Sequence, residues 1–184
     1  VEPEKGNNAI TVAARAISRM KLGRIDASTT ANIGIIEGGI AVNIVPDMVR
    51  ALGEVRSRNQ RKLELQRSRM IEAARLAEED DIEVDIKVER AYDGYLVPAS
   101  DPLVRLVKEA GASRGLKMKV RASGGGSDAN HLNAHGIKAI VLNTGAYNPH
   151  SPDEYLDLKE FHAASAVCKR AVEMYARRFG DAHG

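Results

Sequence analysis

The chain has 184 residues, 43% of them hydrophobic, which is enough to bury the core of one large or two small domains. Its 27 basic and 25 acidic residues are interspersed and leave a formal net charge of +2, which argues against a dedicated nucleic-acid surface. No apolar run approaches the ~20 residues that span a bilayer, so no membrane partner is expected.

Cysteine usage indicates the compartment. Cys168 is the single cysteine of the sequence, so an internal disulfide is excluded. This fits a reducing environment, and no signal peptide is visible. We therefore expect a cytoplasmic protein.

The first half of the chain predicts the order helix, strand, strand, helix, strand. Asn7 or Asn8 can cap the first helix. Apolar and charged residues alternate in the last strand, as in a strand with one buried face. The expected elements are a helix at 9–20, strands at 30–37 and 49–57, a helix at 60–79 and a strand at 82–88. The order matches a ferredoxin-like split β-α-β-β-α-β unit that lacks its first strand, an α+β domain.

The second half predicts an α/β arrangement. A loop at 93–100 marks a boundary, so we expect one domain at 1–94 and another at 95–184. Asp101 and Pro102 suit the start of a helix as cap and first residue. The expected elements are helices at 101–114, 129–134 and 159–179 and strands at 117–122 and 139–142. This pattern is the closing portion of an α/β sandwich.

Two turns in this half are candidates for a site. Gly124, Gly125 and Gly126, hereafter the glycine turn, can each take a positive φ and let a ligand approach the backbone. Amides exposed at such a turn can hold an anion or a developing oxyanion. The second turn places His150 between two prolines, after the strand predicted at 139–142. From the pattern alone, a structural turn and a solvent-facing histidine are the simpler interpretation.

The segments GGGSDAN and NPHSPDEY resemble the C-terminal part of the M20 family of metallopeptidases, and are most similar to its peptidase T-like (tripeptide aminopeptidase) branch. Earlier segments match in order, so the resemblance covers nearly the whole chain. It implies that His150 binds one of two zinc ions and that the glycine turn lines the substrate pocket. It also implies that residues 1–94 are the lid or dimerisation domain, and residues 95–184 the end of the zinc-peptidase sandwich.

The beginning of the chain also carries the resemblance. VEPEKGNNAI is similar to the segment directly after an H-A-G motif of the family. The resemblance therefore implies that this chain is a fragment, or was cleaved at this point.

Two further positions match the family. Asn43 lies in NIVP and Arg56 ends GEVR, and the resemblance implies that both contact the substrate's carboxylate or its scissile carbonyl region. A guanidinium suits a carboxylate, and an amide can donate to an oxyanion. Sequence chemistry alone favours simpler roles: Arg56 paired with a glutamate, and Asn43 as a turn residue before Pro46.

The resemblance implies a mechanism for the parent enzyme, in which two zinc ions lower the pKa of a bridging water that attacks a short peptide. The general base is a glutamate expected upstream of this chain, so no catalytic residue is expected within it. Only His150 matches a metal ligand, and a catalytic zinc needs about three protein ligands. We expect this polypeptide alone to be inactive and to bind zinc weakly.

Two alternatives stay open. The parent enzyme could be a deacylase or amidohydrolase acting on N-acyl amino acids. The chain could also be a non-catalytic self-association module, and a homodimer through the lid domain is expected in any of these cases.

Overall fold

The structure is a computed structural model that describes residues 5–78 and 82–180. The chain divides into two compact units, Val1–Glu89 and Arg90–Gly184. The two predicted domains, 1–94 and 95–184, place the boundary slightly later in the chain.

An antiparallel pair of strands is the scaffold of the first unit. Strand β2 (Thr29–Gly38) pairs with β3 (Val49–Ser57), with Thr29 opposite Ser57 and a β-bulge between Ile33 and Ile35. The short strand β1 (Gly23–Arg24) adds to the other edge of β2 and gives the order β1-β2-β3. The strands predicted at 30–37 and 49–57 are confirmed.

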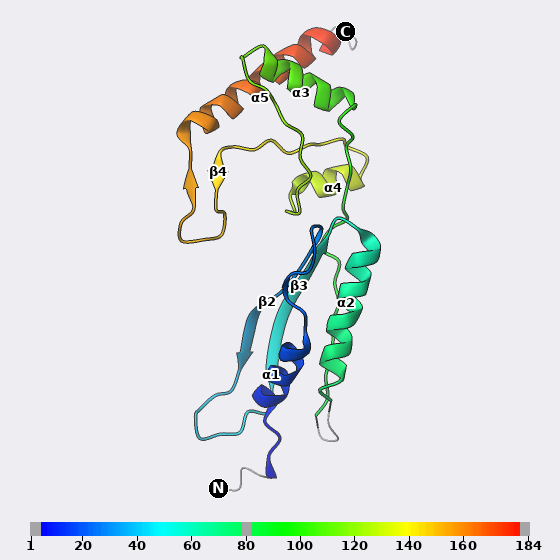
Figure 1. Ribbon diagram of the computed structural model, residues 1–184, viewed down its shortest axis with the longest axis vertical. Coiled ribbons are helices and arrows are strands. Elements are labelled where there is room, and N and C mark those ends of the chain that lie inside the picture. Colours follow the sequence, from blue (N-terminus) through cyan, green and yellow to red (C-terminus); the bar gives the residue numbers. More distant parts are fainter. Residues whose placement is uncertain (1–4, 79–81, 181–184) are drawn as a thin grey trace. The chain divides into compact units, whose positions relative to one another are not determined.

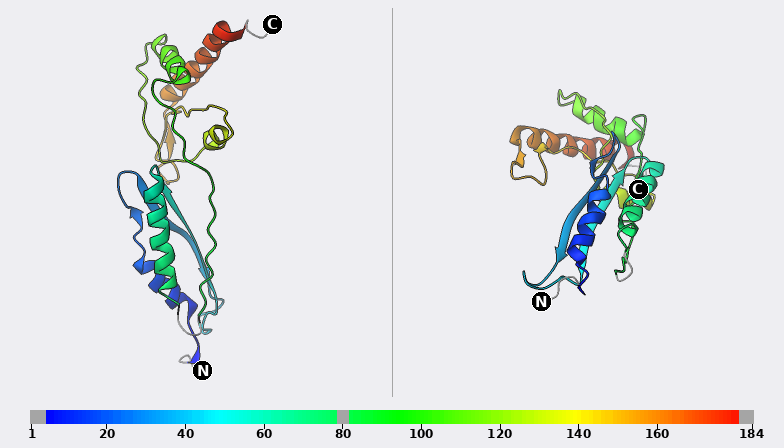
Figure 2. Two further views of the ribbon diagram at one scale, coloured as in Figure 1. Left: turned by 90° about the vertical axis from the view of Figure 1, so that its right-hand side faces the viewer. Right: turned by 60° about the horizontal axis from the view of Figure 1, so that its bottom comes forward.

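Helices α1 (Ala9–Arg19) and α2 (Gln60–Arg75) pack against the ribbon and against each other (Figures 1 and 2). Each begins at an asparagine cap: Asn8 accepts from the Thr11 N–H at 3.0 Å, and Asn59 accepts from the Lys62 N–H at 3.1 Å. Both predicted helices are therefore confirmed.

Helix α2 ends earlier than the predicted residue 79. Its last turn tightens, because the Ala77 N–H donates to the Ala74 carbonyl at 3.1 Å and the Glu78 N–H donates to the Arg75 carbonyl at 3.0 Å. Such three-residue hydrogen bonds commonly terminate an α-helix.

The alternating segment at 82–88 is not a strand, apart from a single bridge at Ile82. Its burial still alternates at the start, with Ile82, Val84 and Ile86 half-buried, and Ile82 packs on Val12, Ala16 and Ala77. A strand also needs the backbone groups of a neighbour, and within the described ranges this segment joins no sheet. The alternation predicted the buried face correctly and the strand wrongly.

Two helices form the core of the second unit. Helix α3 (Pro102–Ala112) lies beside α5 (Leu158–Phe179), as Figure 1 shows, and the pair buries Val107, Ala110, Val167 and Ala171. Asp101 caps α3 by accepting from the Leu103 N–H at 2.9 Å. The predicted helices at 101–114 and 159–179 are confirmed.

The shorter helix α4 (Asp128–Ala134) is also confirmed. Gly136 follows it with a φ of 77°, and the Ile137 N–H donates to the Leu132 carbonyl at 2.9 Å, which is the Schellman ending that favours glycine.

The strands predicted at 117–122 and 139–142 are wrong, since both segments have irregular backbone. Their apolar side chains Met118, Ile140 and Leu142 do pack on the α3–α5 core. In the part of the chain that the structure describes, the second unit has one sheet, the hairpin of β4 (Ala146–Tyr147) and β5 (Tyr155–Leu156). Packing on a helix buries these apolar residues without supplying the backbone partners that a strand requires.

The mixed α/β class is confirmed, whereas the sandwich's sheet is not formed by the described residues. None of the helices in the described ranges combines the length and the apolar content needed to cross a membrane.

The Asp101 carboxylate gives a testable pH dependence. The Lys138 ammonium donates to it at 2.6 Å, and this bond, followed by that of the Leu103 N–H, holds the pKa of Asp101 below its usual value. A carboxyl group whose pKa is lower in the folded than in the unfolded state stabilises the protein at pH values above its unfolded-state pKa of about 3.9. This stabilisation is lost as the pH falls through the folded-state pKa.

We therefore expect Asp101→Asn, which keeps an acceptor for the cap, to be less stable than the parent chain near neutral pH. The difference shrinks below about pH 4. Urea unfolding of both proteins at several pH values measures it, and a difference independent of pH contradicts the role of the charge.

Candidate functional site

His150 lies in the loop that joins β4 to β5. Its side chain is exposed, and its backbone has a φ of 66°, as Asn148 has at 51°. Positive φ is uncommon outside glycine and has to be held by local contacts. The His150 N–H donates to Glu154 Oε2 at 3.1 Å, and the Ser151 hydroxyl donates to the Asn148 carbonyl at 2.9 Å. The loop thus presents the His150 imidazole to solvent on a backbone set by its own polar groups.

The hairpin that carries this loop is anchored to α5. The rings of Tyr147 and Tyr155 stack with centroids 5.0 Å apart, and the Tyr147 hydroxyl lies 2.9 Å from both carboxylate oxygens of Glu160. The hydrogen bond to Glu160 is the main cause of a raised Tyr147 pKa. Gly145 has a φ of 79° and approaches the start of α5, where the Asp157 N–H donates to its carbonyl at 2.9 Å.

These anchors were not predicted from the sequence. Two tyrosines flank the loop in YNPHSPDEY, and this spacing would have indicated a cross-strand aromatic pair around the loop.

The expected zinc site at His150 requires further donor side chains close by. Within residues 5–78 and 82–180, no group of three or more His, Cys, Asp or Glu side chains is arranged to hold a metal ion. Near His150, the carboxylate of Glu154 is engaged by the backbone of the loop. Because a catalytic zinc takes about three protein ligands, the described residues do not by themselves fit such a centre.

The glycine turn differs from the expectation. None of its three residues has a positive φ, so conformational freedom is not what the turn requires. A Cβ built on Gly126 would lie 2.7 Å from Tyr92 Cε1, whereas one on Gly124 would meet nothing within 4 Å. The Tyr92 ring packs on the backbone of Gly126, so a side chain at 126 would force the ring to shift.

Asn130 holds the glycine turn against the segment around Tyr92. Its amide donates to the Asp93 carbonyl at 2.8 Å, and its oxygen accepts from the Ser127 N–H at 3.0 Å. Asn130 and Tyr92 were not predicted as site residues, since their contacts join segments distant in the sequence.

Arg56 and Asn43 belong to the first unit. Arg56 on β3 pairs with Glu54 at 2.8 Å, the glutamate pairing that sequence chemistry suggested, and its side chain is 43% exposed. Asn43 is exposed in the turn between β2 and β3, where the Ile44 N–H donates to the Ala41 carbonyl at 3.2 Å.

His150 and the glycine turn both belong to the second unit. No hydrogen bond or ion pair joins them in the described part of the chain. Each turn is held instead by its own neighbours, Glu154 for His150 and Tyr92 with Asn130 for the glycines.

Comparison with known proteins relates this chain to a protein family. Residues 2–81 match the family model of the M20 peptidase dimerisation domain. Over 178 residues the chain is 40% identical to the uncharacterized protein YqjE of Bacillus subtilis (strain 168), covering 96% of this chain and 48% of that protein. Over 181 residues it is 26% identical to a succinyl-diaminopimelate desuccinylase of Cereibacter sphaeroides, covering 94% and 47%. The chain therefore spans about half the length of the curated relatives it matches.

The chain is also similar to solved structures of peptidases. A tripeptidase from Staphylococcus aureus subsp. aureus Mu50 matches with a TM-score of 0.81 and 34% identity, and the aminopeptidase PepT from Bacillus cereus with 0.70 and 38%. Each match covers 96% of this chain and 48% of the solved chain. The Bacillus subtilis YXEP protein, described as a dinuclear metal-binding peptidase of the M20 family, matches with a TM-score of 0.53 and 20% identity over 89% of this chain and 45% of its own, a likeness of fold alone.

The contact between Gly126 and Tyr92 gives a prediction. We expect Gly126→Ala to destabilise the second unit by about 1–3 kcal/mol, because the new methyl overlaps the ring. Gly124→Ala is the matched control and is expected to change the free energy of unfolding by less than about 0.5 kcal/mol.

The pair can be tested by a double-mutant cycle on urea unfolding. In a Tyr92→Ala background the added methyl has room, so the cost of Gly126→Ala is expected to fall sharply. An equal cost in both backgrounds would show that the ring is not what requires glycine.

Proposed function

Because the chain belongs to the M20 peptidase family, we propose that it is part of a metal-dependent hydrolase that cleaves short peptides, as peptidase T-like enzymes do. The observation that carries this proposal is the likeness to the tripeptidase and PepT structures, which extends along nearly the whole chain at more than 30% identity.

We propose His150 as a ligand to one of two metal ions, with zinc as the expected metal. Its imidazole is exposed at the tip of an anchored hairpin and its main chain is held by Glu154, so the ring is available to a metal. The YXEP protein of the family is described as binding two metals. The further ligands and the general-base glutamate would come from parts of the enzyme outside these 184 residues.

When bound, such a metal would supply an acidic water and polarise the scissile carbonyl. The chain's own residues would bind and orient the substrate. The Arg56 guanidinium suits a peptide carboxylate, and its exposed pairing with Glu54 costs little to exchange, since surface ion pairs contribute about 0–1 kcal/mol. Asn43 can donate an amide hydrogen to the carbonyl region, and the glycine turn would let substrate lie close to the backbone.

We also propose that the first unit mediates homodimer formation. The support is the match of residues 2–81 to a dimerisation domain. A cytoplasmic location remains a proposal that rests on the lone Cys168.

A deacylase acting on N-acyl amino acids is the second candidate. The similarity to a succinyl-diaminopimelate desuccinylase favours it, although at a lower identity than that of the peptidase structures. The full-length protein can be assayed with a tripeptide and with an N-acyl amino acid. The substrate that is turned over faster distinguishes the peptidase from the deacylase.

The isolated 184-residue chain is predicted to have no peptidase activity. One imidazole cannot supply the three ligands of a catalytic zinc, so added zinc is expected to give no turnover of a tripeptide above a protein-free control. Robust zinc-dependent turnover by the purified chain would contradict the proposed division of the metal ligands.

In the full-length protein, His150→Ala is expected to lower tripeptide hydrolysis at least about 100-fold and to reduce the bound metal. His135→Ala is the matched control, because His135 is exposed after α4 and, within the described ranges, its ring contacts the His131 carbonyl of its own helix at 2.8 Å. Activity assays with metal analysis of both variants measure this. Full metal content and activity in His150→Ala would remove His150 from the centre.

A further inference from the structure

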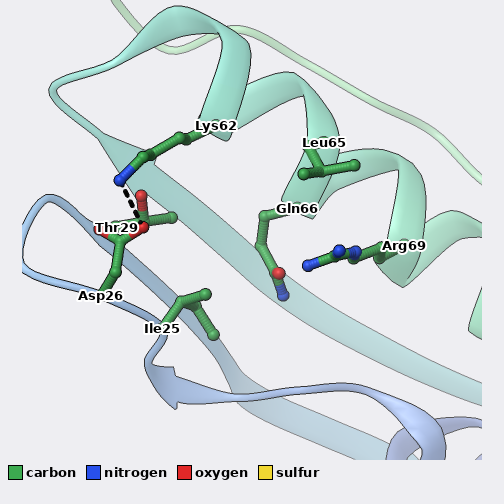
Figure 3. A pocket seen from close by; sticks show the side chains of 7 residues that line it. All are labelled: Ile25, Asp26, Thr29, Lys62, Leu65, Gln66 and Arg69. Atoms are coloured by element: carbon green, nitrogen blue, oxygen red, sulfur yellow. Dashed lines mark hydrogen bonds and ion pairs between the residues drawn. The ribbon is translucent and has the colours of Figure 1, made fainter.

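A pocket of about 140 Å³ lies in the first unit, between the start of β2 and one face of α2 (Figure 3). Helix α2 contributes Lys62, Leu65, Gln66 and Arg69, whose spacing puts them on one face of the helix. The turn before β2 contributes Ile25 and Asp26 to the opposite wall. The volume corresponds to about four or five water molecules at ~30 Å³ each, enough for a small organic molecule.

The pocket contains a buried acceptor without a donor. Gln66 is only 2% exposed, and its amide nitrogen donates to the Lys21 carbonyl at 2.7 Å. This bond fixes the orientation of the carboxamide, and Gln66 Oε1 has no hydrogen-bond partner among the residues that the structure describes. A buried acceptor without a partner is unfavourable, so a ligand donor that reaches it gains a hydrogen bond for which no water has to be displaced from the acceptor.

The pocket is lined by one carboxylate, Asp26, and by two cations, Lys62 and Arg69. Asp26 and Lys62 satisfy each other at 2.9 Å, and Asp26 also accepts from the Ser28 N–H and hydroxyl. The structure gives Arg69 no ion pair or hydrogen bond in the described ranges, and Figure 3 shows its guanidinium beside the Gln66 carboxamide.

The ligand that these groups require has two features. It must bring a hydrogen-bond donor to Gln66 Oε1 and an anionic group to the adjacent Arg69, while Ile25 and Leu65 offer an apolar wall. An α-amino acid carries an ammonium and a carboxylate on one carbon, which suits two neighbouring head groups on a helix. A fully ionised anion brings no donor to Gln66, and Asp26 opposes it.

We propose that this pocket binds a small α-amino acid, with its ammonium donating to Gln66 Oε1, its carboxylate on Arg69 and its side chain against Ile25 and Leu65. The inference does not depend on the proposed catalytic function, because it uses only residues of the first unit.

The test is a titration of the isotope-labelled 184-residue chain with L-alanine, followed by NMR at the Gln66 side-chain amide. Saturable shifts are expected. N-acetylalanine lacks the ammonium and alaninamide lacks the carboxylate, so each is expected to bind at least about tenfold more weakly. Inorganic phosphate is titrated in parallel.

Arg69→Gln is expected to weaken L-alanine binding at least about tenfold, since it removes a charge-assisted hydrogen bond. Arg67→Gln is the matched control on the same helix: Arg67 lines no part of this pocket and pairs with Glu64 at 2.6 Å, so affinity is expected to be unchanged. Both positions are exposed, and the amide spectra of the variants verify the fold.

Several results would overturn the proposal. Absence of saturable shifts would mean that the pocket holds only water, or that Arg69 itself turns to donate to Gln66. Binding of phosphate without binding of L-alanine would make it a simple anion site. Shifts that depend on protein concentration in the absence of ligand would show that a second copy fills the pocket, and equal affinities in the Arg67 and Arg69 variants would remove Arg69 from it.

Discussion

The register of the β2–β3 ladder is the constraint on which the first unit depends. It sets Thr29 opposite Ser57, and the two hydroxyls lie 2.9 Å apart. Since α2 starts just after β3, this register brings the first turns of the helix beside the turn that precedes β2. Lys62 then reaches Asp26, and Gln66 reaches the Lys21 carbonyl. A shift by one residue would exchange the faces of the strands and separate these partners.

The second unit is organised differently, by two helices that bury a small apolar core and by loops docked through single side chains. Tyr92 and Asn130 hold the glycine turn, and Tyr147 with Glu160 holds the hairpin of His150. The proposed metal ligand His150 and the glycine turn thus stand on separately anchored loops. Such loops can present polar groups to a partner because the helices beneath them carry the stability.

Local signals predicted the helices and the long strands. Asn8, Asn59, Asp101 and Ser127 stand where helices begin, and glycine stands where α4 ends, because capping satisfies backbone groups within a few residues of the chain. The segment at 82–88 was predicted as a strand from its alternation, 139–142 from its apolar run, and 117–122 from its place before the glycine turn. Their apolar content is satisfied by packing on helices, which needs no backbone partner and leaves no mark in the pattern.

The sequence by itself determined where helices start, which faces are apolar, and that the chain resembles M20 peptidases through its glycine turn and its histidine turn. Only the tertiary structure decided that the Tyr92 ring packs on Gly126, that Gln66 lines a pocket with an oxygen that no described residue bonds, and which residues hold the loop of His150. The physical reason is range: caps and alternation act between neighbours in the chain, whereas these contacts join residues that only folding brings together.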